Sequence, residues 1–171
     1  GYINDSFSID EYKGNLRIVT TVEDTNSVYV LDEKLEIIGE IEGLAEDERI
    51  YSARFLGETG YFVTFRETDP LFSVDFSAPE NPKIIGQLKI PGFSDYLHYY
   101  GDGKLLGIGM DVEEETQITG GVKLTMFDVS DPTDVKEADT YVLENVYSTE
   151  VSYDYKAALI DPGTNRIGFP A

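Results

Sequence analysis

An internal repeat of about 44 residues constrains the fold of this chain more than any other feature of its sequence. Three segments rich in Val, Ile, Leu and Phe end in an aspartate, at Asp32, Asp75 and Asp128, and each leads through a short polar link to a second strand-like run. A further pair of runs precedes each of these segments, at residues 7–12 and 16–22, 50–56 and 60–66, and 95–100 and 104–109. Each complete unit therefore contains four predicted strands.

Four short antiparallel strands in 40 to 50 residues are typical of one blade of a β-propeller. We therefore predict an all-β protein, a β-propeller with four-stranded antiparallel blades of about 44 residues. The blades are expected at about residues 6–45, 50–92 and 94–145, with part of a fourth at 146–171. An irregular β-sandwich is the alternative fold.

The fourth unit has room for two full strands, predicted at residues 147–153 and 156–161. Closed propellers need at least four complete blades, so the sequence predicts an incomplete propeller with open terminal blades. Open blades expose apolar faces and unpaired strand edges, so we expect self-association through the terminal blades. Residues 40–49 could form one helical turn, although Gly43 interrupts it.

Composition excludes several classes of function. The chain has 13 Lys and Arg against 33 Asp and Glu, a net charge of −20, which repels nucleic acid and anionic membrane surfaces. No cysteine is present, which excludes disulfides, thiolate metal sites and cysteine nucleophiles, and a single histidine excludes sites built from several imidazoles. No apolar run is long enough for a membrane span, so no membrane insertion is expected in this segment.

The repeat aligns four polar residues at one position of consecutive blades: Asp10, Arg54, His98 and Glu150. The first strand of a propeller blade lines the central channel, so these residues are predicted to form a polar ring there. One interpretation is a set of salt bridges between blades, and the other is a ligand site at the mouth of the channel. His98 beside carboxylates could also act as an acid or base, but no nucleophile motif accompanies it.

An acidic insertion between Gly109 and Val122 is a weak candidate for a calcium site. Its potential oxygen ligands are Asp111, Glu113, Glu114 and Glu115. Their spacing is not that of an EF-hand, so a charged, solvated loop is the alternative. No other cofactor is expected.

Tyrosines are concentrated at the beginnings of the third and fourth units, at Tyr96, Tyr99, Tyr100, Tyr147, Tyr153 and Tyr155. Most are expected to pack between blades. A tyrosine-rich rim could also bind a carbohydrate or a peptide by stacking.

Four strings also resemble a known family: NDSFSIDEYKGNLRIVTT at residues 4–21, ERIYSARF at 48–55, VTFRETDPL at 63–71 and LKIPGFSDYLH at 88–98. They are similar, in order and spacing, to the bacterial and archaeal secreted proteins with a C-terminal β-propeller domain. Two departures are visible: Tyr99 stands where the family usually has proline, and Tyr155 where it has a second histidine. The resemblance implies an exported, multi-bladed protein, extracellular or in the cell envelope, and no catalytic residues that transfer to this chain.

These observations favour a scaffold that binds a protein or a glycan ligand. The alternative is a carbohydrate- or peptide-active enzyme, a hydrolase or lyase, that uses carboxylates near the channel mouth.

Overall fold

The computed structural model describes residues 1–23, 25–65, 69–113, 115–116 and 118–171. Three four-stranded sheets follow one another along the chain. The first contains β1 (Ile9–Tyr12), β2 (Asn15–Val22), β3 (Thr25–Leu31) and β4 (Ile37–Leu44). The second contains β5 (Arg49–Leu56), β6 (Thr59–Phe65), β7 (Asp69–Asp75) and β8 (Lys83–Ile90). The third contains β9 (Phe93–Gly101), β10 (Lys104–Val112), β11 (Thr119–Asp128) and β12 (Lys136–Leu143).

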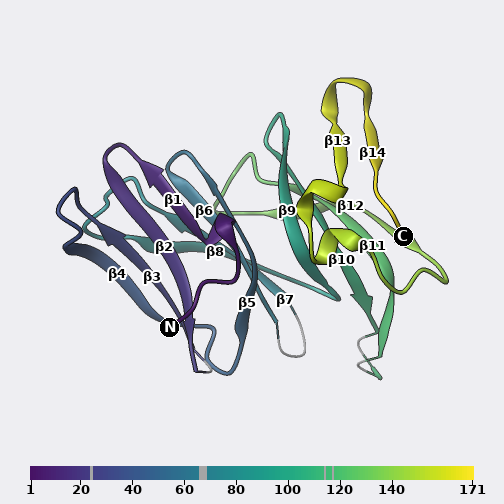
Figure 1. The fold of residues 1–171 in the computed structure, drawn as a ribbon, viewed down its shortest axis with the longest axis horizontal. Coiled ribbons are helices and arrows are strands. Elements are labelled where there is room, and N and C mark those ends of the chain that lie inside the picture. Colours follow the sequence, from purple (N-terminus) through teal and green to yellow (C-terminus); the bar gives the residue numbers. More distant parts are fainter. Residues whose placement is uncertain (24, 66–68, 114, 117) are drawn as a thin grey trace.

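Within each sheet the strands are antiparallel and lie in sequence order. The three sheets lie side by side along the molecule, from the purple first sheet to the green third sheet (Figure 1). This arrangement confirms the all-β prediction and is consistent with three propeller blades, which we number 1 to 3. The array is not closed into a ring.

Tight turns fix the register of the inner hairpins. The β1–β2 turn is Lys13-Gly14, with φ of 52° and 83°, and the β9–β10 turn is Asp102-Gly103, with φ of 50° and 70°. Positive φ at both central residues is the geometry of the two-residue turn that matches the twist of antiparallel strands. The glycine and its polar neighbour therefore fix the register of the hairpin, and the register determines on which face of the blade each side chain lies.

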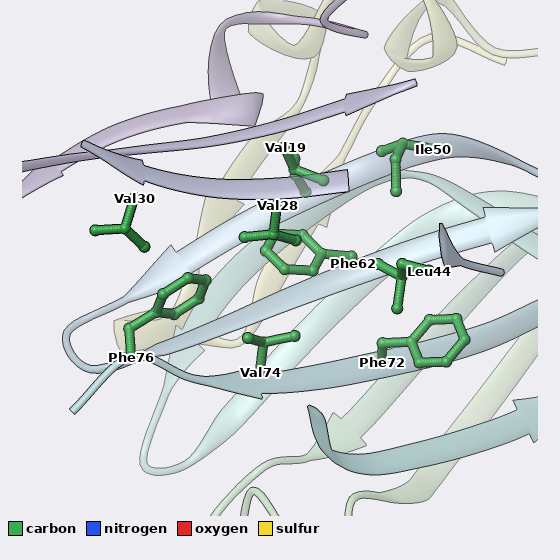
Figure 2. Packing of buried hydrophobic residues seen from close by; sticks show 10 residues of the cluster. Val19, Val28, Val30, Leu44, Ile50, Phe62, Phe72, Val74 and Phe76 are labelled. Atoms are coloured by element: carbon green, nitrogen blue, oxygen red, sulfur yellow. The ribbon is translucent and has the colours of Figure 1, made fainter. Parts of the chain in front are cut away.

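Alternate residues of each strand form the cores between blades. Blades 1 and 2 share a cluster that includes Val19, Val28, Phe62, Phe72 and Val74, all nearly inaccessible to solvent (Figure 2). Blades 2 and 3 share a second cluster, which contains Tyr61, Val63, Leu71, Leu97, Leu105, Phe127, Val129 and Val135. The middle blade thus buries both of its faces, as propeller blades do.

The C-terminal segment differs from the prediction. Residues 147–153 do not form a strand: the chain makes two 3₁₀ turns, η2 (Glu150–Ser152) and η3 (Tyr155–Ala157), followed by a small hairpin of β13 (Leu159–Asp161) and β14 (Arg166–Gly168). Thr149 Oγ1 accepts a hydrogen bond from the Val151 amide, and Asp154 Oδ1 accepts one from the Lys156 amide. These caps satisfy local backbone groups and favour a turn over a strand ladder.

The C-terminal segment still covers the outer face of blade 3. Val151, Ile160, Ile167 and Phe169 pack there with Leu106 and Ile108 of β10. Since a fourth blade would occupy the same face, the segment acts as a small fourth unit.

The structure also decides one point that the sequence left open and corrects one prediction. Residues 40–49 contain no helical turn, because β4 continues through Gly43, whose φ of 70° accompanies a register shift in the β3–β4 ladder. The insertion after Gly109 is not loop throughout, since Met110 and Val112 extend β10 and are buried. The helices in the described ranges are single 3₁₀ turns of three residues, so none of them could cross a membrane.

Candidate functional site

A pocket of about 310 Å³ lies where the N-terminal ends of the innermost strands meet the C-terminal segment. Four separate parts of the chain line it: the segment before β1, the starts of β5 and β9, and the η2–η3 turns. Its lining residues are Asn4, Asp5, Phe7, Arg49, Ile50, Tyr51, Asp95, Tyr96, Val151, Ser152, Tyr153 and Tyr155. The volume is within the range of small-ligand sites.

Asp95, near the start of β9, is the pocket carboxylate whose environment is most perturbed. Its Oδ2 accepts a hydrogen bond of 2.7 Å from the Ser152 hydroxyl of η2. Burial raises the pKa of Asp95 above its ordinary value, against the opposing effects of the Ser152 hydrogen bond and the Arg49 charge. Asp95 therefore links blade 3 to the C-terminal segment and is also available to a ligand.

Arg49, at the start of β5, supplies positive charge to the pocket. Its guanidinium lies 4.7 Å from the centre of the Tyr51 ring, and Nη2 donates a 2.8 Å hydrogen bond to the Tyr51 hydroxyl. That contact raises the pKa of Arg49, so the side chain stays charged at every ordinary pH. Asn4 Nδ2 donates to the Tyr51 carbonyl at 2.6 Å and ties the N-terminal segment to β5.

Aromatic rings form one wall of the pocket. Phe7, Tyr96 and Tyr155 are mutual neighbours, with ring centroids 4.8 to 5.9 Å apart. Tyr153 also lines the pocket, and its side chain is 90% exposed. The C-terminal turns thus contribute two tyrosines to a wall that begins in the N-terminal segment.

Arg54 of β5 packs against two rings of this aromatic wall. Its Nε donates a 2.8 Å hydrogen bond to the Leu97 carbonyl of β9, and Nη2 bonds the same oxygen. The guanidinium lies 3.9 Å from the Phe7 ring centre and 5.4 Å from that of Tyr96. Burial lowers the pKa of Arg54 from its ordinary value. Arg54 therefore joins blade 2, blade 3 and the N-terminal segment at one point.

The predicted polar ring is found in part. Asp10, Arg54 and His98 occupy the same ladder position in β1, β5 and β9, opposite Arg17, Tyr61 and Leu106. His98 Nδ1 lies 2.9 Å from the Tyr96 hydroxyl. Burial, followed by the charge of Arg54, lowers the pKa of His98, so its imidazole is neutral at pH 7. Arg54 and His98 are thus connected through Tyr96.

Glu150 does not occupy the fourth equivalent position. It lies in η2, is exposed and does not line the pocket, because the Thr149 cap turns this segment away from a strand. Arg54 reaches blade 3 through the Leu97 carbonyl oxygen and lies over two aromatic rings, so these contacts, within the described chain, differ from the salt bridges of the first interpretation. Asp10 forms its ion pair with Arg17 of the same blade.

Arg17 of β2 links blades 1 and 2, a role that the sequence analysis did not identify. Its side chain is only 3% exposed, its Nη1 donates a 2.6 Å hydrogen bond to the Gly57 carbonyl, and its guanidinium lies 4.8 Å from the Phe55 ring centre. Two features of the sequence could have indicated this role. Arg17 lies on the predicted strand that follows the strand of Asp10, and the sequence has few basic residues.

The side chains of the acidic insertion point to different partners in the described part of the chain. Asp111 Oδ1 lies 3.8 Å from the Lys123 ammonium, and Glu113 accepts a hydrogen bond from Thr116. Glu115 is exposed, and Glu114 lies outside the described residues. Among those that are described, no three acidic or histidine side chains come together as metal ligands.

Comparison with known proteins decides the family. The model of the "Beta propeller domain" family matches residues 1–171. The chain belongs to this family. That result confirms the resemblance noted in the sequence, and the three four-stranded antiparallel sheets agree with it.

Two archaeal relatives of this β-propeller domain are similar over its whole length. An uncharacterized protein of Archaeoglobus fulgidus is 51% identical over 172 residues, which cover 100% of this chain and 26% of that protein. An uncharacterized protein of Methanocaldococcus jannaschii is 43% identical over 178 residues, which cover 100% of this chain and 28% of that protein. This β-propeller domain therefore spans about a quarter of the length of these curated relatives.

Proposed function

We propose that this β-propeller domain is a binding scaffold without catalytic activity, extracellular or in the cell envelope, and that its ligand occupies the pocket around Asp95 and Arg49. The observation that carries the proposal is the convergence of four distant chain segments on one pocket of about 310 Å³. The location follows from the resemblance of the sequence to exported propellers.

The composition of the pocket supports binding. Specific small-ligand sites combine aromatic surface with a few polar groups that fix the orientation of the ligand. Here Phe7, Tyr96 and Tyr155 supply the surface, while Asp95 and Arg49 supply an acceptor and donors. Both polar groups lie near the starts of β5 and β9, the first strands of blades 2 and 3, and a site built on strands is positioned more precisely than one built on loops.

An enzyme that acts on carbohydrates or peptides is supported less well. Burial raises the pKa of Asp95, as expected for a general acid. Glycoside hydrolysis usually needs a second carboxylate across the cleft. The other pocket carboxylate, Asp5, instead caps η1, because its Oδ1 accepts a 2.8 Å hydrogen bond from the Phe7 amide. The geometry therefore favours binding over catalysis.

A thermal-shift screen tests the proposal. The panel contains neutral saccharides, charged saccharides, amino acids and short peptides, each at millimolar concentration. We expect at least one class to raise the melting temperature of the parent, since a ligand that binds only the folded state stabilises it. The shift should be lost in Asp95→Asn. No shift with any class would contradict the proposal, and turnover of nitrophenyl glycosides or peptides that Asp95→Asn abolishes would establish the enzyme instead.

A further inference from the structure

The charges of the pocket exclude a strongly charged ligand. Arg49 and Asp95 are close enough that each shifts the pKa of the other, and Asp5 adds a second carboxylate. An anion would be repelled by these carboxylates and by the net charge of −20. A cation would have to compete with Arg54 and Arg49, which already lie over the rings of Phe7 and Tyr51. The electrostatics therefore favour a neutral ligand.

The hydrogen-bonding groups that remain suit hydroxyls. Asp95 uses Oδ2 for Ser152, and within the described residues no side chain or amide donates to Oδ1. The guanidinium of Arg49 uses Nη2 for Tyr51, and its other N–H groups donate to no atom of the described chain. A hydroxyl can donate to the carboxylate and accept from the guanidinium, which a purely apolar ligand cannot do.

Aromatic surface next to these groups suits a ring with an apolar face. Tyr153 lines the pocket with its side chain 90% exposed, and Tyr155 packs on Phe7 and Tyr96 behind it. An exposed tyrosine combines a large apolar face with a polar tip. At about 30 Å³ for each water, the pocket holds about ten water molecules, and a monosaccharide or disaccharide would displace them.

We infer that this pocket binds a neutral saccharide, with one sugar face on Tyr153 and vicinal hydroxyls bound by Asp95 and Arg49. The inference rests on the proposed function, because it names the ligand class of the same site. Before binding, Asp95 is hydrogen-bonded to Ser152 and Arg49 to Tyr51.

The inference is tested by isothermal titration calorimetry with a defined set of sugars. The neutral probes are glucose, galactose, mannose, N-acetylglucosamine, maltose, cellobiose and lactose, and the charged probes are glucosamine and glucuronate. We expect at least one neutral probe to bind with a Kd below 10 mM and the charged probes to bind at least tenfold more weakly. Binding of no neutral probe, or tighter binding of a charged one, would overturn the inference.

Exposed positions provide variants that should keep the fold. Tyr153→Ala should weaken sugar binding about tenfold, Arg49→Gln should weaken it by a similar factor, and Tyr141→Ala should leave it unchanged. Tyr141 is a matched control because its side chain is 66% exposed and lies on β12, outside the pocket. Unchanged binding in both pocket variants would overturn the assignment.

The screen described above separates the two hypotheses. If amino acids or peptides stabilise the protein in an Asp95-dependent manner and sugars do not, the saccharide inference fails and the binding function stands. If no class stabilises it, both fail.

Discussion

At the scale of single residues, two arginines on neighbouring blades have similar structural roles. Arg17 and Arg54 each extend from one blade to a backbone carbonyl of the next and lie against aromatic rings there. A planar guanidinium can stack and donate several hydrogen bonds at once, which an ammonium cannot do. With only 13 basic residues in the chain, two are therefore used to join blades rather than to balance charge.

Arg54→Ala should lower the free energy of unfolding by about 3 kcal/mol, because it removes a charged hydrogen bond and a cation–π contact. Arg54→Lys should recover less than half of that loss. Chemical denaturation measures both values, and Glu115→Ala, an exposed substitution in the acidic insertion, should stay within about 0.5 kcal/mol of the parent. An Arg54→Ala variant as stable as the parent would remove its structural role.

Asp95 should make stability depend on pH in the reverse of the usual direction for a carboxylate. Burial raises the pKa of Asp95 in the folded state, so the folded protein binds the proton more tightly than the unfolded chain. Ionised Asp95 therefore lowers the free energy of unfolding at pH values above its pKa in the folded protein. This loss disappears as the pH falls toward the pKa of the same carboxyl in the unfolded chain. Asp95→Asn should melt higher than the parent at pH 7, and the difference should shrink near pH 4. A difference that stays constant with pH, or has the opposite sign, would contradict this account; the exposed Asp139→Asn is the control.

At the scale of strands and turns, the sequence predicted the sheets well. Alternating β-branched and aromatic residues between glycine-containing turns left few other ways to bury these runs, and the runs predicted at residues 16–22, 50–56, 95–100 and 104–109 all lie in strands. Residues 147–153 were mispredicted because short-range caps at Thr149 and Asp154 outweigh their aromatic content. Competition between local caps and strand ladders depends on where the chain goes next, which composition does not show.

The pocket could not be predicted from the sequence, for a different reason. The repeat correctly aligned Asp10, Arg54 and His98, since ladder position follows from strand register. Seven of the twelve residues that line the pocket, however, lie outside the strands of the blades, including Asn4 and Ser152. Their proximity to Asp95 results from tertiary packing of the two ends of the chain, which no spacing in the sequence encodes.

A glycine in β10 provides a prediction about strand packing. A Cβ on Gly109 would overlap the Phe93 carbonyl oxygen and approach Ser94 Cα to 2.7 Å, next to a register shift in the β9–β10 ladder. Gly109→Ala should therefore destabilise the protein by about 3 kcal/mol and reduce amide-exchange protection in β9 and β10. Gly168→Ala in β14, where a Cβ meets no atom within 4 Å, should melt with the parent. Equal melting temperatures of the two variants would contradict this prediction, because they would show that β9 can move away from the added Cβ with little loss of stability.

At the scale of the whole molecule, the first blade exposes a face that the other blades bury. Leu31 occupies the ladder position of Val74 and Phe127, which are 0% and 1% exposed in the cores between blades, whereas Leu31 is half-buried. Tyr29 and Ile18 lie on the same side of blade 1 and are also half-buried. The hydroxyls of Thr20 and Thr25 are buried on blade 1 without hydrogen-bond partners in the described chain. Within the described chain, no blade covers this face of blade 1.

We expect this face to cause self-association of the chain, most simply as a two-fold dimer. The net charge of −20 opposes association, but the repulsion is screened beyond about 8 Å at physiological salt, so the dimer should strengthen as salt rises. Tyr29→Asp should weaken the dimer at least tenfold, because it places a charge in an apolar contact, whereas Tyr141→Asp on β12, the outermost strand of blade 3, should not. Sedimentation velocity at low and high salt measures both effects. A parent chain that remains monomeric under both conditions would show that blade 1 tolerates this exposed face without a partner.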